Sequence, residues 1–215
     1  DLVTNKDIVQ RFHREARIAH GLDHPGIVRV VLFGQLPDGN LYLVLEFLEG
    51  PTLMEALERD KVFAPARAVK VVASVADAIG YAHERGVIHR DLKPENIVLT
   101  AREGDPEYPK VLDFGIAKRD EAAEDIQQAK LTRQGMVLGT PPYMSPEQFT
   151  GQKLKGTSDI YSLAIVVYEM LTGQLPFTAS TPWEWATKHL TAPPQPFEHH
   201  PAGAQLLPRH KQAVM

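Results

Sequence analysis

Hydrophobic and polar residues alternate with two different periods along the chain, and these periods predict a β-hairpin and several helices. Two runs rich in Val, Leu, Ile and aromatic residues flank a turn-forming Leu-Pro-Asp-Gly-Asn sequence, which indicates a hairpin. Three other segments repeat apolar residues at steps of three and four, as helices do. The expected strands are residues 27–33 and 41–47, and the expected helices are residues 5–20, 65–85 and 159–171.

The longest expected helix has a proline suited to its first turn, Pro65, and a glycine suited to its C-terminal end, Gly86. The helix at 159–171 is apolar almost all round, so we expect it to be buried. The evidence for the longest helix is a set of residues that recur at steps of three and four, namely Val69, Val72, Ala76, Ile79 and His83.

Between the hairpin and the later helices, Glu49-Gly50-Pro51-Thr52 interrupts the pattern. Thr52 and Glu55 have the spacing of a capping box, which predicts a short helix after the break. Strands that precede a run of helices suit an α+β protein with a small sheet-bearing part and a larger helical part. The break from Glu46 to Pro51 is the expected hinge between them.

Composition excludes several classes of protein. The 215 residues contain no cysteine, so disulfides, thiolate metal sites and a cysteine nucleophile are excluded. The net charge of −4 gives no sign of the excess of basic residues that is typical of nucleic-acid-binding proteins. The longest apolar stretch, residues 163–171, is interrupted by Glu169 and is too short to span a bilayer. We expect a cytoplasmic chain without a membrane segment, and any tether to the inner membrane would lie outside it.

The residues that carry chemistry cluster around two short apolar runs, 97–99 and 111–112. If these runs pair as a hairpin, Asn96 at the start of one strand meets Asp113 at the end of the other. Two oxygen donors at one end of a hairpin can hold Mg²⁺, which takes few protein ligands and keeps places for water and phosphate. Asp91 adds a carboxylate that the metal does not consume, and Lys93 adds a cation. This combination suits phosphoryl transfer.

Four motifs in a fixed order resemble the protein-kinase family. His-Arg-Asp-Leu-Lys-Pro-Glu-Asn at 89–96 resembles its catalytic loop, and Asp-Phe-Gly at 113–115 resembles its magnesium loop. Gly-Thr-Pro-Pro-Tyr-Met at 139–144 resembles its substrate-docking segment, and Ser-Pro-Glu at 145–147 resembles its Ala-Pro-Glu. Lys93 together with Thr140 is similar to the serine/threonine branch of the family. The sequence as a whole is similar to bacterial members of that branch. The resemblance covers residues from about 8 to 190.

The resemblance implies a serine/threonine protein kinase that transfers the γ-phosphate of ATP to protein hydroxyl groups. Asp91 would accept or orient the proton of the substrate hydroxyl, and Lys93 would steady the transferring phosphate. Asn96 and Asp113 would hold the Mg²⁺ ions that bridge the ATP phosphates. Protein substrates and ATP are therefore the expected partners.

Further positions follow from the same resemblance. Glu15 would pair with the lysine that contacts ATP, and Asp159 would brace the catalytic loop from below. The segment from Glu46 to Leu48 would offer backbone groups to adenine, with Val98 under the ring. Each of these positions is carried over from the family's motifs.

The loop between Asp113 and Glu147 contains Thr132. The resemblance implies that a phosphate on Thr132 would dock on Arg90 and order this loop, because it adds about −1.5 to −2 charge. Thr132 would then be an activating autophosphorylation site, to which self-association of two kinase chains could contribute. The alternative is that Thr132 is an ordinary solvated loop residue. Glu147 would pair with a late arginine of the family, for which the chain shows no counterpart.

The resemblance implies a two-lobed fold that is incomplete at both ends. Residues 1–48 would form part of the sheet lobe and the start of the hinge, and residues 49–215 the mainly helical lobe. Neither a Gly-x-Gly-x-x-Gly loop nor a lysine on a strand before the first helix is found. We therefore expect the isolated 215-residue piece to transfer phosphate poorly. A kinase-like scaffold that binds partners without phosphotransfer remains the alternative.

Overall fold

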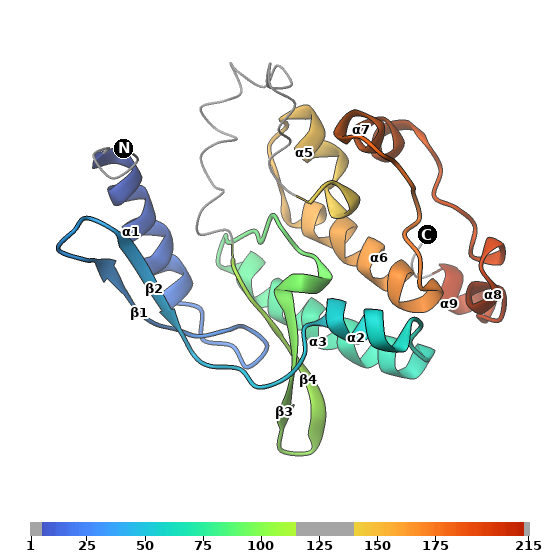
Figure 1. Cartoon of the computed structure of the whole chain (residues 1–215), viewed down its shortest axis with the longest axis horizontal. Helices are drawn as coiled ribbons and strands as arrows, with labels where there is room; N and C mark the ends of the chain where they lie inside the picture. Colours follow the sequence, from blue (N-terminus) through green and yellow to red (C-terminus); the bar gives the residue numbers. More distant parts are fainter. Residues whose placement is uncertain (1–5, 115–139, 213–215) are drawn as a thin grey trace.

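The computed structural model describes residues 6–114 and 140–212, which form a mixed α+β fold. Helix α1 (Lys6–His20) lies against a hairpin of β1 (Val30–Gln35) and β2 (Leu41–Leu45), at the left of Figure 1. A second hairpin and the remaining helices form the rest of the molecule. These are β3 (Ile97–Arg102), β4 (Asp105–Val111), α2 (Leu53–Asp60), α3 (Pro65–Glu84), α5 (Pro146–Thr150), α6 (Gly156–Thr172), α7 (Pro182–Thr191), α8 (Pro201–Ala204), α9 (Pro208–Gln212) and the 3₁₀ turns η2 (Pro94–Asn96), η4 (Pro141–Tyr143) and η5 (Phe197–His199).

The first hairpin and helix α1 confirm the sequence prediction, although β1 begins three residues later than expected. β1 and β2 are antiparallel, and Val30 pairs with Leu45. The two residues before Arg29 pair elsewhere: Ile27 forms a parallel bridge with Val111, and the Val28 amide donates to the Val111 carbonyl at 2.9 Å. This segment therefore connects the first hairpin to the second.

Helix α3 occupies the predicted residues, with Pro65 in its first turn and Gly86 just past its end at a φ of 72°. The residues whose spacing indicates this helix do not share one buried face, because Ile79 is completely buried whereas Val69 is 61% exposed. Hydrophobic residues surround most of this helix, so their spacing alone allows more than one face. Helix α3 packs against both α6 and β4, and most of its buried residues are alanines and valines. Its buried residues are Ala68, Val71, Val75, Ala78, Ile79 and Ala82.

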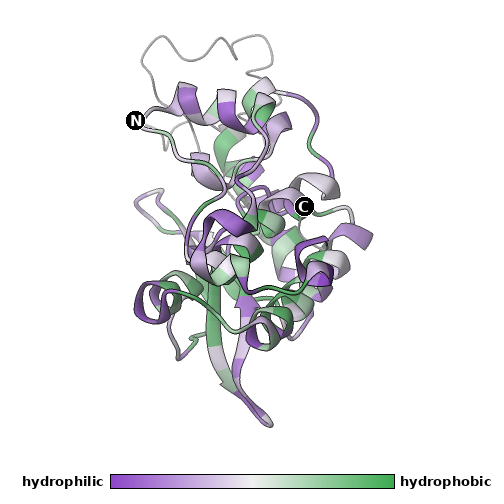
Figure 2. Cartoon of the chain, turned by 90° about the vertical axis from the view of Figure 1, so that its right-hand side faces the viewer, coloured by the Kyte–Doolittle hydropathy of each residue, from purple (hydrophilic) through white to green (hydrophobic). Residues whose placement is uncertain are grey.

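Helix α6 is buried on most sides, as its composition predicts, and it begins three residues before the expected start. Val166 and Met170 are completely inaccessible to solvent. Figure 2 shows hydrophobic residues concentrated on the helices of this part of the molecule. The main core therefore lies between α3, α6 and the inner ends of β3 and β4.

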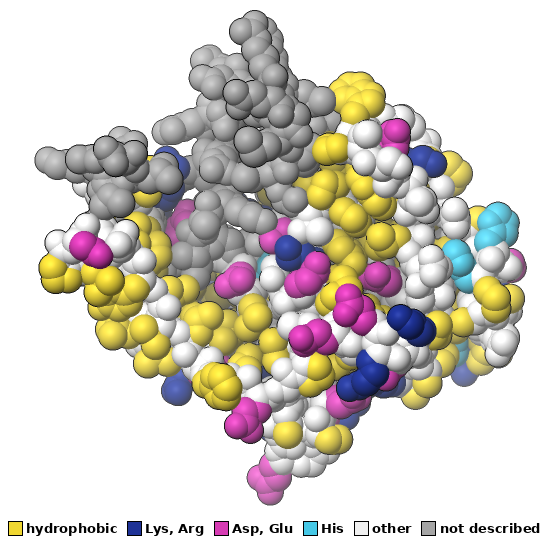
Figure 3. Space-filling view, viewed as in Figure 1, with side chains coloured by type: hydrophobic (Ala, Val, Ile, Leu, Met, Phe, Trp, Pro, Cys, Tyr) yellow, Lys and Arg dark blue, Asp and Glu magenta, His cyan; other side chains and the backbone are white. Residues whose placement is uncertain are grey.

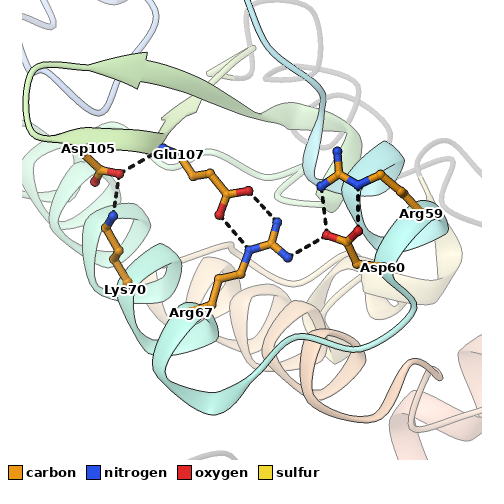
Figure 4. A network of polar contacts seen from close by, with 6 residues as sticks. All are labelled: Arg59, Asp60, Arg67, Lys70, Asp105 and Glu107. Carbon is orange, nitrogen blue, oxygen red and sulfur yellow. Dashed lines mark hydrogen bonds and ion pairs between the residues drawn. The ribbon is translucent and has the colours of Figure 1, made fainter.

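The second hairpin is longer than predicted, because β4 extends through the polar residues 105–110. The charged side chains of this part of β4 form ion pairs with helix α3 (Figure 4). Arg67 of α3 contacts Glu107 at 2.6 Å and Asp60 at the end of α2 at 2.7 Å. Lys70 of α3 contacts Asp105 of β4. The outer half of the hairpin is thus fixed to α3 by charge rather than by apolar burial.

The segment that connects β2 to α2 runs along β3. The Leu99 amide donates to the Pro51 carbonyl at 2.8 Å, and Thr52 forms a bridge with Val98. Gly50 has a φ of 144°, and a Cβ at this position would lie 1.9 Å from the Leu99 oxygen. Only glycine fits this approach. Thr52 then caps α2 in the predicted capping box with Glu55.

The hairpin of β1 and β2 exposes apolar side chains. Leu32 and Val44 lie opposite each other and are 53% and 42% exposed, and Phe47 just beyond β2 is 87% exposed. Figure 3 shows hydrophobic side chains gathered over these strands. None of the helices in residues 6–114 and 140–212 has the length and apolar character needed to cross a membrane.

Candidate active site

The pairing of β3 with β4 sets the framework of the candidate site. Ile97 pairs with Val111, and the Leu112 amide donates to the Asn96 carbonyl at 2.8 Å. Asn96, which precedes β3, and Asp113, which follows β4, therefore lie at the same end of this hairpin. Asp113 is exposed and has a φ of 52°, a left-handed conformation that aspartate tolerates better than most residues.

The catalytic-loop motif folds back on this hairpin end. Asn96 donates from Nδ2 to the Asp91 carbonyl at 2.8 Å, and the same nitrogen lies 3.4 Å from Asp91 Oδ2. Because its nitrogen is used in this way, the side-chain oxygen of Asn96 is the atom left for a cation. Lys93 Nζ lies 3.6 Å from Asp91 Oδ2 and donates to Thr140 Oγ1 at 2.7 Å. The structure thus brings Asp91, Lys93, Asn96 and Thr140 together.

The donor set at this end fits Mg²⁺ by its chemistry. Asp113 offers a carboxylate and Asn96 an amide oxygen, which are hard ligands of the kind that Mg²⁺ takes in small number. Asp91, with Lys93 beside it, offers a second carboxylate at the same hairpin end.

A buried carboxylate supports this loop from below. Asp159, at the start of α6, is 1% exposed. Its Oδ2 accepts from the His89 amide at 2.8 Å and contacts His83 Nε2 at 2.7 Å, while its Oδ1 accepts from the Arg90 amide at 2.8 Å. Arg90 has a φ of 69°, so these bonds hold a backbone conformation that L-residues seldom adopt.

His89 joins the loop to the end of β4, a contact that the sequence reasoning did not assign. Its Nε2 lies 2.7 Å from the Leu112 carbonyl, so Nε2 carries the proton and donates. Its Nδ1 accepts from the Asp91 amide at 3.3 Å. Burial lowers the pKa of His89, although the negative charges of Asp159, Asp91 and Asp113 act in the opposite direction. The imidazole is therefore neutral and bridges two backbone segments.

The expected hinge begins at Glu46, whose side chain is held on two sides. Its Oε1 accepts from the Arg29 amide at 2.8 Å and from Lys110 Nζ at 2.6 Å. Burial acts to raise the pKa of this carboxyl, but the bonds from Lys110 and Arg29 outweigh burial and lower it. Lys110 pairs across the hairpin with Val98, so the hinge and the expected floor of the adenine site are connected. The sequence reasoning missed Lys110 because only the fold brings it to Glu46.

Other predicted residues lie on the elements around this centre. Glu15 is 5% exposed on the inner face of α1. A small pocket lined by Ala19, Val30, Leu45, Asp113 and Phe114 separates this helix from the hairpin end. Leu48 lies half-buried on the connecting segment.

The two remaining predictions concern Glu147, expected to pair with a late arginine, and Thr132, expected to be phosphorylated. Within the described ranges, Glu147 Oε2 is buried and has no hydrogen-bond partner. Thr132 falls within 115–139, outside the described residues. Its expected phosphorylation stays a prediction.

Comparisons with known proteins identify the family of this chain. Residues 2–202 match the model of the protein kinase domain. The chain is 42% identical over its whole length to serine/threonine-protein kinase pkn3 of Myxococcus xanthus, of which it covers 39%. It is 39% identical over 91% of its length to serine/threonine-protein kinase PknB of Mycolicibacterium smegmatis, of which it covers 31%. The chain spans about two fifths or less of these relatives.

Proposed function

Because this chain belongs to the protein kinase domain family, we propose that its parent protein is a serine/threonine kinase that transfers the γ-phosphate of ATP to protein hydroxyl groups. The observation that carries the proposal is the gathering of Asp91, Lys93, Asn96 and Asp113 at one end of the β3–β4 hairpin. A scaffold that only binds partners needs none of these four side chains in this arrangement.

Each side chain has a role in this proposal. Asp91 accepts or orients the proton of the substrate hydroxyl, and its carboxylate lies 3.6 Å from Lys93 Nζ. Lys93 steadies the transferring phosphate and, through Thr140, ties the catalytic loop to the substrate-docking segment. Asn96 and Asp113 hold Mg²⁺, which neutralises charge on the ATP phosphates when bound.

The nucleotide would lie between the two hairpins. The backbone from Glu46 to Leu48 offers hydrogen-bonding groups to adenine, and Val98, which is 7% exposed, lies under the ring. Arg90 would bind a phosphate on the loop that contains Thr132, and Glu15 would pair with a lysine that contacts ATP. Both roles rest on the family resemblance.

Phosphate transfer by the full-length protein tests the proposal. We expect label from [γ-³²P]ATP and Mg²⁺ to appear on serine or threonine of a protein substrate, or of the kinase itself. Asp91→Asn should reduce turnover at least 100-fold, because proton transfer by a positioned side chain contributes about 10²–10⁴-fold. Peptide mapping of the product would also show whether Thr132 is modified.

Nucleotide binding separates the kinase from the scaffold alternative. We expect Mg-ATP to raise the melting temperature of the parent protein and of Asp91→Asn, but much less that of Asp113→Asn, which loses a carboxylate ligand. Binding of Mg-ATP without any phosphate transfer by the parent protein would favour a scaffold. Turnover by Asp91→Asn equal to that of the parent would contradict the assigned role.

A further inference from the structure

The backbone of Arg90 is strained and is held from both sides. A φ of 69° in a residue other than glycine costs about 1–3 kcal/mol and persists only where the surroundings impose it. Asp159 of α6 holds the amide of Arg90 at 2.8 Å. The carbonyl of the same residue is held by Gln148 of α5, whose Nε2 donates to it at 2.8 Å.

Both ends of the Gln148 amide are engaged, which fixes its orientation. Oε1 accepts from the Ser145 amide at 2.9 Å and lies 3.3 Å from Ser145 Oγ. If the amide were turned over, its NH₂ group would face the Ser145 amide and its oxygen would face the Arg90 carbonyl. The side chain is therefore a bridge of defined polarity between α5 and the catalytic loop.

The carbonyl that Gln148 holds belongs to the peptide unit that contains the Asp91 amide. Since a peptide unit is planar, fixing the Arg90 oxygen fixes the plane from which Asp91 projects. The Asp91 amide in turn donates to His89 Nδ1. The contact from α5 thus acts directly on the backbone that carries the proposed catalytic carboxylate.

We propose that Gln148 is a positioning residue for Asp91, which it orients by holding the Arg90 carbonyl. The kinetic consequence rests on the proposed kinase function, whereas the structural consequence does not. No sequence motif indicates this role, because Gln148 follows the Ser-Pro-Glu segment and meets the catalytic loop only in the folded chain.

Three variants isolate this contact. Gln148→Glu has the same shape and keeps an acceptor for the Ser145 amide, but it places an oxygen against the Arg90 carbonyl. Gln148→Met removes the donor without adding charge. Ser145→Ala is the matched control, because it removes the Ser145 hydroxyl from the capping box of α5 and leaves the bond from Gln148 to Arg90.

Steady-state kinetics of the full-length protein give the first readout. We expect kcat to fall about 10–100-fold in Gln148→Glu and Gln148→Met, since small displacements of a reacting group can cost about 100-fold. The KM for ATP should stay within about twofold, because the proposed adenine contacts lie on residues 46–48 and 98. Ser145→Ala should keep the parental kcat. A parental kcat in both Gln148 variants, or a rise in KM alone, would overturn the proposal.

Hydrogen exchange gives a second readout that does not need activity. Amides of residues 89–91 should exchange at least tenfold faster in both Gln148 variants than in the parent or in Ser145→Ala, with the protection of α6 unchanged. Unchanged exchange at 89–91 would overturn the proposal, and so would a loss that extends through α6, which would show a general effect on stability. If the parent protein transfers no phosphate, the proposed function fails, and this exchange experiment still decides the role of Gln148.

Discussion

The two hairpins of this molecule are both antiparallel pairs of strands, but different kinds of interaction hold them in place. The β3–β4 hairpin is fixed at its inner end by buried polar groups, His89 and Asp159, and at its outer end by ion pairs to α3. The β1–β2 hairpin packs on α1 with one face and exposes Leu32 and Val44 on the other. A hairpin of two strands has little stability by itself, so its neighbours determine how firmly its ends are placed.

This difference matters for the candidate site, because each hairpin contributes to it. The proposed catalytic and metal-binding side chains all lie in the segments directly before β3 and directly after β4, next to the helical core. Glu46 follows β2, and it is placed by Lys110 of the other hairpin. Lys110 of the second hairpin thus helps to place the start of the proposed hinge, and the variants below compare how firmly the two regions are held.

The largest effect is expected at the carboxylate below the β3–β4 hairpin. Asp159→Asn keeps the shape of the side chain but replaces one acceptor oxygen with a donor, beside the His83 ring and the amides of His89 and Arg90. Disrupting a buried charged hydrogen-bond network costs about 3–5 kcal/mol. Denaturant unfolding should show a loss of this size in the free energy of unfolding.

An exposed aspartate provides the matched control for this substitution. Asp77 contacts His24 Nε2 at 3.1 Å, but its side chain is 76% exposed. Asp77→Asn should cost less than about 1 kcal/mol, as exposed ion pairs do. Equal losses from Asp159→Asn and Asp77→Asn would contradict the view that buried polar groups hold the catalytic loop.

A pair of valines compares the two hairpins directly. Val111 of β4 is completely buried, whereas Val44 of β2 is 42% exposed. Val111→Ala should cost about 2 kcal/mol, because two buried methyl groups leave a cavity. Val44→Ala should cost less than about 1 kcal/mol, which is the range of strand propensity. Both values come from denaturant unfolding, and a larger loss at Val44 would show that the exposed face of β2 is covered in solution.

How much of this could be predicted from the sequence differs between local and long-range features. Turn, cap and motif residues act on their neighbours, so the first hairpin, the capping box at Thr52 and the α+β class were all predicted correctly. The spacing of apolar residues in α3 does not identify its buried face, since the choice between several apolar faces depends on α6 and β4. β4 was too short in the prediction, because Arg67 and Lys70 of a distant helix stabilise its polar half.

The candidate site shows the same division. The motifs named the residues that gather at the hairpin end, because their chemistry is visible in the sequence. The contacts that position them were missed: His89 to Leu112, Lys110 to Glu46 and Gln148 to Arg90 are separated by 23, 64 and 58 residues. Only the folded chain brings such pairs together, and no local pattern indicates them.

The smallest expected effect is a loss of folding stability at acidic pH that comes from His89, the histidine below the β3–β4 hairpin. Burial lowers the pKa of His89 in the folded protein, and the charges of Asp159, Asp91 and Asp113 only partly oppose this. The unfolded histidine has a pKa near 6.5, so below that pH the unfolded state binds the additional proton and stability falls as pH falls. Between pH 7 and pH 6 this group should account for at most about 0.7 kcal/mol of lost stability.

The variant His89→Gln isolates this contribution from the other titrating groups. Glutamine keeps a donor that can reach the Leu112 carbonyl, but it has no proton to gain between pH 7 and pH 6. We expect the variant to be less stable than the parent at pH 7, and to lose less stability than the parent on acidification to pH 6. Denaturant unfolding of both proteins at the two pH values measures the difference. If both lose the same amount, the neutral imidazole is not what makes the inner end of this hairpin sensitive to acid.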